Sequence, residues 1–411
     1  MKNQEKSLQN YDTNNRYVSM GCRLNALESE KIVRMLTMAG AKNTIVVNTC
    51  AVTQEAEKQS KQAIRKLARE NPDATIFITG CGATRAVEEY AALPNVARVI
   101  TNADKMNLSA YGLDFTPNTQ FCETILPVSD LSKAFVQVQN GCNHKCTYCI
   151  VSQLRGKNVA FPYEQIVKDV KDAVADGFYE IVLTGVDIAG YVLSDENCGN
   201  MFLDNVCRRL LNDVPKLARL RLSSMDPASP ATSRVCDLMA ENPKMLSHLH
   251  LSMQSGSDTI LRAMGRRHNA DMVRRIAQNK ISMSWDIICG FPGETEKLFN
   301  ETLDLVRELK PIHIHAFPFS ARPGTAAATM ENQVPRDVAR ARVKIISDAA
   351  QKNRMEFMKT LIGTTAEILM ENNNIGRNDD DIPVRVSGAP IPARTITQVK
   401  ILGVNDDYLL A

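Results

Sequence analysis

At the point that decides its fold, the chain reads Gln139-Asn140-Gly141-Cys142-Asn143-His144-Lys145-Cys146-Thr147-Tyr148-Cys149. The cysteines have the spacing Cys-x-x-x-Cys-x-x-Cys. With 11 cysteines in 411 residues, chance would place about 0.008 such triplets in the chain, so accident is a poor explanation. Three thiolates this close in sequence can hold a metal ion or an iron-sulfur cluster.

The composition of the triplet favours a cluster over a zinc ion. No fourth ligand lies nearby in the sequence, and no second Cys-x-x-Cys pair accompanies the triplet. A four-iron cluster normally takes four thiolates, so three would leave one iron open to a small molecule. A fortuitous group of buried thiols is the remaining alternative.

Length and composition predict a globular chain of two or three domains, since 411 residues with 44% hydrophobic content suffice for ordinary cores. The apolar runs are too short for a membrane span, and the polar start lacks an apolar signal core. An odd number of cysteines, grouped by motif, fits a reducing compartment. We therefore expect a cytoplasmic protein without a membrane partner. The net charge of +3 is too small to predict a nucleic-acid partner by itself.

After a predicted mobile tail at 1–15, residues 16–101 show the pattern of a small parallel α/β domain. The predicted strands are 17–20, 44–48, 75–79 and 97–100. The predicted helices are 26–38, 54–69 and 84–90. One cysteine follows each of the first three strands: Cys22, Cys50 and Cys81. Ligands of parallel sheets collect at the carboxyl ends of strands, so we expect these thiols to converge and to be able to hold a second cluster. The alternative is three small hydrophobic residues at strand ends.

A linker at 102–131, with Pro117 and Pro127, precedes a larger domain at 132–362. Six predicted strands alternate with helices there: 134–139, 181–184, 218–223, 248–253, 285–289 and 312–317. Six successive β-α units indicate a parallel barrel or partial barrel.

Polar residues alternate with apolar ones along three of these strands and predict a polar lumen. The polar set is Arg219, Arg221, Ser223, His248, His250, Ser252, Gln254, His313 and His315. A polar lumen implies a bound ligand or water, because a barrel without either fills its interior with Val, Ile and Leu. For each histidine alone, a structural hydrogen bond is the simpler interpretation.

The chain closes with a long amphipathic helix at 334–362, opened by Pro335, and a small antiparallel β domain at 363–411. The predicted strands of this domain are 366–370, 382–386, 395–401 and 408–410. Small β-barrels often bind RNA, and a packing role is the alternative.

The triplet Cys142, Cys146 and Cys149, with Tyr148 before its last cysteine and at the end of the first strand of a six-unit barrel, resembles the radical S-adenosylmethionine enzymes. The resemblance implies that S-adenosylmethionine chelates the open iron. One electron from the cluster then yields a 5'-deoxyadenosyl radical, while the protein positions the cofactors and excludes water.

The rest of the chain is similar to one family within that superfamily, the methylthiotransferases. The matching amino-terminal segments are Gly21-Cys22-Arg23-Leu24-Asn25, Asn48-Thr49-Cys50-Ala51-Val52-Thr53 and Thr79-Gly80-Cys81. The matching barrel segments are His250-Leu251-Ser252-Met253-Gln254-Ser255-Gly256-Ser257, Asp286-Ile287-Ile288-Cys289-Gly290-Phe291-Pro292-Gly293-Glu294-Thr295 and Phe317-Pro318-Phe319-Ser320-Ala321-Arg322-Pro323-Gly324-Thr325. The final domain resembles a TRAM domain, an RNA-binding β-barrel. The implied fold class is α/β, with a parallel amino-terminal domain, a partial (β/α)6 barrel and a small carboxy-terminal β-barrel.

The opening motif, followed by Glu28-Ser29-Glu30, resembles the branch that adds methylthio to carbon 2 of N6-threonylcarbamoyladenosine at position 37 of tRNA. The branch that acts on isopentenyladenosine usually carries Gln-Met in place of Arg23-Leu24. A third branch modifies an aspartate of a ribosomal protein. An iron-sulfur protein that binds RNA and senses redox state without catalysis is an alternative of a different class.

The resemblance implies two [4Fe-4S] clusters, one on Cys142, Cys146 and Cys149 and one on Cys22, Cys50 and Cys81. It also implies two S-adenosylmethionine molecules per product, one as methyl donor and one as radical source. The implied partners are the anticodon stem-loop of tRNA and an electron donor of the flavodoxin or ferredoxin type.

Five residues at strand ends are candidates for S-adenosylmethionine contacts by position: Thr184, Gly185, Ser223, Gln254 and Gly290. Each has a simpler interpretation in a turn, a cap or a backbone hydrogen bond. A run of arginines is a candidate phosphate-binding surface, or a solvated helix face: Arg262, Arg266, Arg267, Arg274 and Arg275. The family's Ser-Arg pair after Arg155-Gly156 is missing here. The other cysteines match no ligand motif and are interpreted as ordinary thiols: Cys122, Cys198, Cys207, Cys236 and Cys289.

Overall fold

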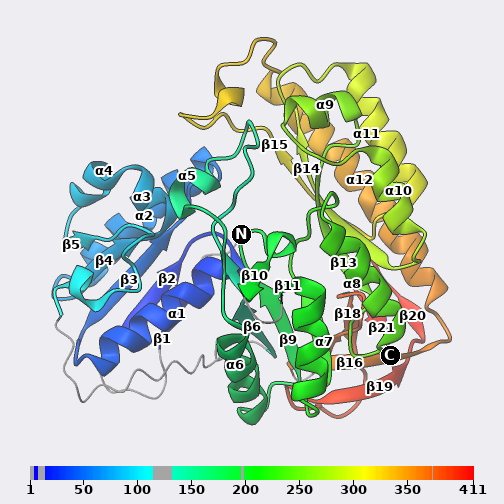
Figure 1. Cartoon of the computed structure of the whole chain (residues 1–411), viewed down its shortest axis with the longest axis horizontal. Helices are drawn as coiled ribbons and strands as arrows, with labels where there is room; N and C mark the ends of the chain where they lie inside the picture. Colours follow the sequence, from blue (N-terminus) through cyan, green and yellow to red (C-terminus); the bar gives the residue numbers. More distant parts are fainter. Residues whose placement is uncertain (1–3, 8–13, 114–131, 196–198, 373) are drawn as a thin grey trace.

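The computed structural model describes residues 4–7, 14–113, 132–195, 199–372 and 374–411. Figure 1 shows three parts: an amino-terminal α/β domain in blue and cyan, a barrel domain in green to orange, and a carboxy-terminal sheet in red. Cys122 and Cys198 lie outside the described residues.

The amino-terminal domain is a five-stranded sheet with helices on both faces. Its spatial order is β1 (Gln4–Ser7), β2 (Arg16–Ser19), β3 (Thr44–Thr49), β4 (Thr75–Thr79) and β5 (Val96–Val99). Its helices are α1 (Arg23–Met38), α2 (Gln54–Glu70), α3 (Gly80–Arg85) and α4 (Val87–Ala91). Strands β2 to β5 pair in parallel, as predicted. The single helix predicted at 84–90 is two short helices, because the chain turns into α3 directly at Gly80.

Two predicted boundaries of this domain are wrong. Gln4–Ser7 pairs antiparallel with β2 instead of belonging to a mobile tail. The predicted linker begins too early, because the 3-10 helix η1 (Leu108–Tyr111) packs on the amino-terminal domain. Leu108 and Tyr111 are buried against Val46 and Phe77, so burial of apolar surface keeps this segment in the domain. Residues 114–131 of the predicted linker lie outside the described residues.

Six parallel strands form the partial barrel. They are β6 (Lys133–Gln137), β9 (Glu180–Thr184), β12 (Arg219–Leu222), β13 (His248–Gln254), β14 (Ser282–Cys289) and β15 (His313–Pro318). Strands β6, β9 and β12 form one sheet and β13, β14 and β15 another. Single bridges, Leu220 to Met245 and Met225 to Leu251, connect the two sheets between β12 and β13. The strand order therefore follows the sequence, as expected for successive β-α units.

Helices cover the outer face of the barrel. They are α6 (Tyr163–Ala175), α7 (Leu203–Asp213), α8 (Pro230–Glu241), α9 (Asp258–Ala263), α10 (Ala270–Ala277), α11 (Glu296–Leu309) and α12 (Arg336–Thr360). Helix α12 begins after Pro335, as predicted. Arg342 of this amphipathic helix is buried and pairs with Glu294 at 2.8 Å. Short elements complete the domain: β7 (Gln139–Asn140), α5 (Val151–Arg155), β8 (Val159–Ala160), η2 (Ile188–Gly190), the hairpin β10 (Val192–Asp195) and β11 (Gly199–Phe202), and η3 (Ala326–Ala328).

Strand β13 shows the predicted alternation between core and lumen. Leu249, Leu251 and Met253 are buried in the core, whereas His250 and Gln254, on the other face, are only partly buried. Successive side chains of a strand point to opposite faces, so the apolar set packs under the outer helices and the polar set faces inward. The prediction of a polar lumen is confirmed for this strand.

At the amino-terminal ends of the strands, a buried ion-pair network closes the barrel. Glu180 accepts from Arg219 and from Arg221, each at 2.8 Å. Arg219 also pairs with Asp379 at 2.8 Å, and Lys133 pairs with Asp381. Arg219 and Arg221 therefore hold the carboxy-terminal domain against the barrel floor.

The carboxy-terminal domain is a curled six-stranded sheet (Figure 1). Its spatial order is β19 (Ile396–Lys400), β16 (Thr365–Asn372), β17 (Ile375–Arg377), β18 (Pro383–Arg385), β21 (Leu409–Leu410) and β20 (Gly403–Val404). All pairs are antiparallel except β18 with β21, which is parallel and departs from the prediction. The small β domain itself is confirmed, with β17 and β20 added to the predicted strands.

Candidate active site

The cysteine loop that follows β7 is fixed to its neighbours by backbone and amide contacts. Gln139 is fully buried, and its Oε1 accepts from the amides of Val186 and Asp187 at 2.9 and 2.8 Å. The amide of Cys142 donates to the carbonyl of Gly156 at 3.0 Å. The loop is therefore held between the end of β9 and the end of α5.

Each sulfur of the loop receives one N–H donor. The amide of His144 lies 3.4 Å from Sγ of Cys142, and the amide of Val151 lies 3.4 Å from Sγ of Cys149. The guanidinium of Arg266 donates to Sγ of Cys146 at 3.6 Å. N–H donors stabilise thiolates and are among the contacts that tune iron-sulfur clusters, so this donor set fits a cluster.

The protonation of these thiols depends on what they bind. Burial raises the pKa of Cys142 to about 12, and nearby Cys149 and Cys146 add to that rise. Burial also raises the pKa of Cys149. Without a cation the thiols of Cys142 and Cys149 stay protonated at neutral pH, whereas coordination to a metal deprotonates them. Ligand binding here therefore releases protons.

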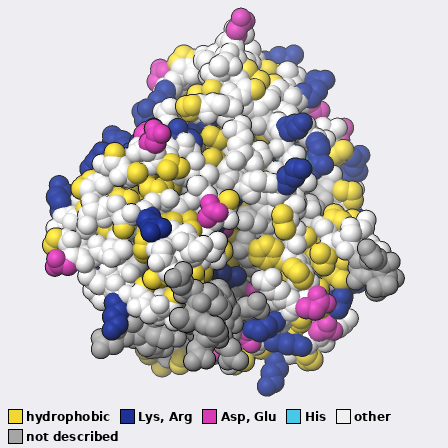
Figure 2. Space-filling model, turned by 60° about the vertical axis from the view of Figure 1, so that its left-hand side comes forward, with side chains coloured by type: hydrophobic (Ala, Val, Ile, Leu, Met, Phe, Trp, Pro, Cys, Tyr) yellow, Lys and Arg dark blue, Asp and Glu magenta, His cyan; other side chains and the backbone are white. Residues whose placement is uncertain are grey.

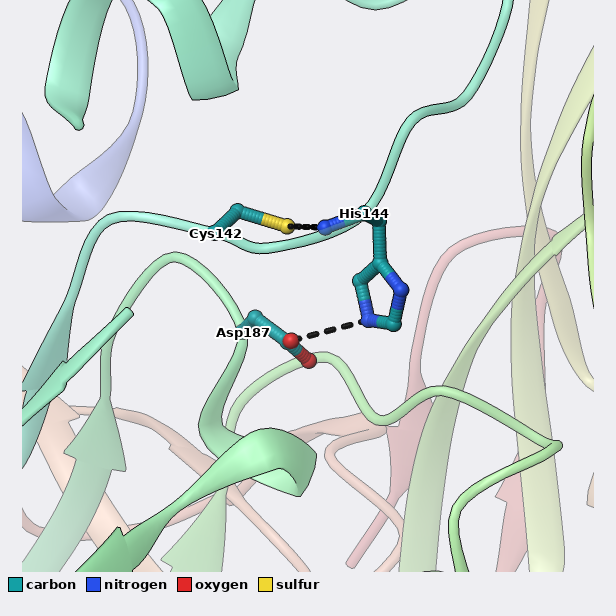
Figure 3. A group of neighbouring side chains, drawn as sticks. All are labelled: Cys142, His144 and Asp187. Atoms are coloured by element: carbon teal, nitrogen blue, oxygen red, sulfur yellow. Dashed lines mark hydrogen bonds and ion pairs between the residues drawn. The ribbon is translucent and has the colours of Figure 1, made fainter. Parts of the chain in front are cut away.

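One alternative metal group shares a cysteine with the triplet. The donor atoms of Cys142, His144 and Asp187 lie within 4.8 Å of one another, a spacing suited to a single ion. Figure 3 shows the imidazole of His144 turned toward Asp187, to which its Nε2 lies at 2.9 Å, while Sγ of Cys142 faces the backbone amide of His144. Thiolates of a four-iron cluster bind different irons and stand farther apart than donors to one ion. The triplet and this group are therefore competing uses of Cys142.

The three amino-terminal cysteines converge at the carboxyl ends of adjacent strands. Cys22 caps α1 after β2, Cys50 follows β3, and Cys81 lies in the first turn of α3 after β4. Burial raises the pKa of Cys50 to about 11, and the proximity of Cys22 and Cys81 adds to the rise. Sγ of Cys50 accepts from the amide of Val52, and Sγ of Cys81 from Nδ2 of Asn102, both at 3.5 Å. The structure thus brings together the three thiols that the sequence placed at strand ends.

The two triplets face each other across the boundary between the domains. Helix α5, which follows Cys149, lies beside α3, which carries Cys81 (Figure 1). Burial is the main cause that raises the pKa of Cys149, and the nearby thiol of Cys81 contributes to it. Groups bound to the two triplets would therefore be neighbours.

The five candidates for S-adenosylmethionine contacts lie where the sequence placed them, at the carboxyl ends of β9, β12, β13 and β14. Gln254 ends β13 with a φ of +67°, a left-handed conformation that is strained for a non-glycine residue. Gly290 has a packing role, because a Cβ there would lie 2.5 Å from Cβ of Ala339 in α12. Gly185 lies against Gln139, while Thr184 is buried and Ser223 partly exposed.

The run of arginines is only partly exposed: Arg262, Arg267 and Arg275 are exposed, whereas Arg266 and Arg274 are partly buried. Arg266 turns inward to Cys146 and also donates to Asp226 at 3.2 Å. Arg274 is paired with Glu308 and Asp271. Figure 2, in which the amino-terminal domain is turned forward, shows Lys and Arg side chains dispersed over that face of the molecule. Asp226 and Glu308, which pair with Arg266 and Arg274, come from other β-α units, so the run of positive charge gave no sign of them.

Asp226 is a residue of the site that sequence reasoning missed. It follows β12, is buried, and accepts from Arg266 and Arg267 beside the cysteine loop. Burial opposes ionisation, but the arginines outweigh it and lower the pKa of Asp226. No motif marks an isolated Asp-Pro pair as part of a site.

The histidines of the lumen line its open side along β13 to β15. His250 bonds Ser284 at 2.7 Å and lies 3.0 Å from Asp286. The rings of His313 and His315 lie 4.3 Å apart, centroid to centroid, and both side chains are exposed. This wall of the lumen is therefore polar and open to solvent.

Comparisons with known proteins agree with this geometry. The radical SAM superfamily matches residues 136–306, and a family described as uncharacterized protein family UPF0004 matches residues 15–101. A threonylcarbamoyladenosine tRNA methylthiotransferase, MtaB, from Rickettsia prowazekii is 38% identical over 95% of this chain and 96% of its own length. This chain belongs to the radical SAM methylthiotransferase family. It is therefore an enzyme that transfers a methylthio group, and its superfamily uses a [4Fe-4S] cluster and S-adenosylmethionine.

Other similar proteins are named for a different substrate nucleoside. A tRNA-2-methylthio-N(6)-dimethylallyladenosine synthase from Novosphingobium aromaticivorans is 32% identical over 87% of this chain and 86% of its own length. Among solved structures, the radical S-adenosylmethionine methyltransferase TsrM from Kitasatospora setae matches with a TM-score of 0.53 at 16% identity, over 73% of this chain and 68% of that one. That likeness shows the fold of the methylthiotransferase barrel and no more.

In the part of the methylthiotransferase that the structure describes, every helix is too short or too polar to cross a membrane. Cys207, Cys236 and Cys289 are buried free thiols within the barrel domain.

Proposed function

We propose that this methylthiotransferase adds a methylthio group to carbon 2 of N6-threonylcarbamoyladenosine at position 37 of tRNA. The observation that carries the substrate is the 38% identity, over nearly the whole of both chains, to a relative named for that nucleoside. The opening motif with Arg23-Leu24 supports the same branch.

The proposal assigns a [4Fe-4S] cluster to each cysteine triplet. Cys142, Cys146 and Cys149 would hold the radical-generating cluster, and Cys22, Cys50 and Cys81 the auxiliary one. When bound, the clusters and two S-adenosylmethionine molecules supply radical and methyl-transfer chemistry, which an unactivated aromatic C–H needs and acid-base side chains cannot provide. The N–H donors at the sulfurs of Cys142, Cys146 and Cys149 support this assignment.

The residues of the chain hold and shield these groups. Gln139 fixes the cysteine loop to the end of β9, and Arg266 joins the loop to Asp226. The proposed S-adenosylmethionine contacts are Thr184, Gly185, Ser223, Gln254 and Gly290, at the mouth of the barrel. Substrate adenine would enter the open lumen beside His250 and His315.

The proposed partners are the anticodon stem-loop of tRNA and an electron donor of the flavodoxin or ferredoxin type, and the proposed location of the reaction is the cytoplasm. Residues 363–411 would contact the RNA as a TRAM-like domain, and 132–362 would form the catalytic unit. The amino-terminal unit extends to about residue 113, where the described part of the domain ends.

A dimethylallyladenosine substrate is the second candidate, favoured by the relative that is 32% identical over 87% of the chain. The two substrates share the adenine ring and differ in the group on N6. Mass spectrometry of tRNA nucleosides from cells with and without the gene separates them. Loss of methylthio-threonylcarbamoyladenosine supports the first proposal, and loss of only the isopentenyl counterpart replaces it with the second.

Iron content tests the cluster assignment. After anaerobic reconstitution we expect about eight irons per chain in the wild type and about four when Cys22, Cys50 and Cys81 are replaced by Ala. Replacing the buried, unassigned Cys207, Cys236 and Cys289 by Ala is the matched control and should leave the iron content unchanged. Four irons in the wild type would remove the auxiliary cluster from the proposal.

A further inference from the structure

Two arginines of the barrel domain reach into the amino-terminal domain. Arg155 ends α5, and its guanidinium donates to both carboxylate oxygens of Glu28, at 2.8 and 2.9 Å. The same guanidinium donates to Oδ1 of Asn25 at 2.7 Å. Arg322 follows β15 and lies 2.6 Å from Oε1 of Glu57. The two arginines lie near opposite ends of the barrel sequence, but both contact the amino-terminal domain.

Both glutamates lie on helices that follow ligand cysteines. Glu28 is in α1, which begins directly after Cys22, and Glu57 is in the first turn of α2, which follows Cys50. Arg85, at the end of the helix that carries Cys81, also pairs with Glu57. A shift of α1 or α2 would therefore move the thiols of Cys22 and Cys50.

Both contacts are buried, and the contact of Arg155 with Glu28 is directional as well. The side chains of Arg155 and Glu28 are 3% and 1% exposed, and that of Arg322 is 2% exposed. A two-pronged arginine-carboxylate contact fixes angle as well as distance. Lys105 pairs with the second oxygen of Glu28 at 2.6 Å, so the carboxylate has no freedom to turn away.

Stability alone is a weak reason for such contacts. Burial of a charge is costly, and a buried ion pair is often no more stabilising than apolar packing. Nε, Nη1 and Nη2 of Arg322 have no hydrogen-bond partner among the described residues, so its contact with Glu57 is an ion pair only, which adds to that cost. What these pairs supply is a defined orientation between two domains.

Arg155 also lies next to the cysteines themselves. Oδ1 of Asn25, which accepts from Arg155 at 2.7 Å, also accepts from Sγ of Cys22 at 3.6 Å. Nη1 of Arg155 donates to Oδ1 of Asn140, two residues before Cys142, at 3.2 Å. The arginine thus stands between the amino-terminal triplet and the loop of Cys142, Cys146 and Cys149.

We infer that Arg155 and Arg322 are positioning residues that clamp the amino-terminal domain onto the barrel and set the placement of one cysteine triplet relative to the other. The inference rests on the proposed two-cluster function. The clamp leaves radical formation at Cys142, Cys146 and Cys149 intact and governs delivery of the methylthio group.

The test compares Arg155→Met and Arg322→Met with Arg219→Met in the full-length reconstituted enzyme. Arg219 is the matched control, because it is a buried arginine that also joins two domains, but at the barrel floor. We expect the clamp variants to form 5'-deoxyadenosine within about twofold of the wild type while methylthio product per 5'-deoxyadenosine falls at least about tenfold. Arg219→Met should keep the wild-type ratio, and Arg155→Lys should recover part of it.

Amide hydrogen exchange of the iron-free full-length chain tests the clamp without depending on enzyme activity. Exchange should increase at 23–38 in Arg155→Met and at 54–70 in Arg322→Met, and at neither segment in Arg219→Met. Unchanged exchange, or a product ratio equal to that of the wild type, overturns the clamp. A wild-type enzyme that forms no methylthio product contradicts the proposed function instead, and the exchange result then decides the clamp alone.

Discussion

Glu180, the first residue of β9, accepts a hydrogen bond of 2.8 Å from Arg219, the first residue of β12. The parallel register places this contact at the end of the barrel opposite the cysteine loop. Burial by itself would raise the pKa of Glu180, but Arg221, Lys133 and Arg219 outweigh it and lower the pKa from 4.5 to about 2.

This pair predicts how stability depends on pH. A carboxyl whose pKa is depressed in the folded state stabilises the fold above its unfolded pKa, and this stability is lost as pH falls through the folded value. The contribution of Glu180 should therefore be complete above pH 4.5 and decline toward pH 2. Glu180→Gln should cost about 3–5 kcal/mol at pH 7, because it leaves buried cations without their partner. Urea unfolding across this range should show a shallower pH dependence in the variant, and equal slopes would contradict the assignment.

Removal of the carboxy-terminal domain should destabilise the barrel. Without 363–411, the cations Lys133, Arg219 and Arg221 lose their ion pairs with Glu367, Asp379 and Asp381. Glu180 is then their one remaining carboxylate partner among the described residues. We expect the thermal midpoint of the barrel to fall by about 5 °C or more. Asp379→Asn removes one carboxylate of this network and should lower the thermal midpoint less. An unchanged thermal midpoint would show that contact with the carboxy-terminal domain does not stabilise the barrel.

Gly141 should be more sensitive to substitution than Gly156, although both have positive φ. A Cβ at Gly141 would lie 1.9 Å from the carbonyl oxygen of Lys157, whereas a Cβ at Gly156 would meet nothing within 4 Å. Gly141→Ala should cost about 1–3 kcal/mol more than Gly156→Ala, since both pay backbone strain but only one clashes. Urea unfolding of the iron-free chain measures the difference, and reconstituted iron should fall only in Gly141→Ala. Equal losses of unfolding free energy in the two variants would show that the backbone at Gly141 does not lie against Lys157.

Substitution of Gln254 distinguishes two roles of this residue, a contact to the cofactor and a place in a turn. Its φ of +67° is strained, so Gln254→Gly should raise stability by about 1 kcal/mol. If the side chain also contacts S-adenosylmethionine, the same change should weaken binding by about tenfold, roughly the value of one hydrogen bond. Calorimetric titration of the reconstituted enzyme measures the affinity. A gain in stability with unchanged affinity would remove Gln254 from the site.

Much of the fold follows from local patterns. The alternation of Leu249, Leu251 and Met253 with polar neighbours was enough to identify β13 and its two faces. The spacing of Cys142, Cys146 and Cys149 was enough to identify the loop, because all three donors lie within one short segment. The convergence of Cys22, Cys50 and Cys81 needed one further rule, that parallel strands end at the same edge of a sheet.

Other features had no signal of this kind. The segment containing Leu108 and Tyr111 looked like a linker, because its few apolar residues have no sustained period. Arg266 was grouped with exposed arginines, because nothing in its neighbourhood indicates that Asp226, from another β-α unit, neutralises it.

The sequence by itself determined which cysteines lie close together and which strands build the barrel, since both depend on short-range spacing and on the geometry of parallel sheets. Only the tertiary structure decided how the two triplets face each other. Arg155 and Glu28 are separated by 127 positions and belong to different domains. A single charged residue has no periodicity, so its partner is set by the packing of the domains and not by any pattern along the chain.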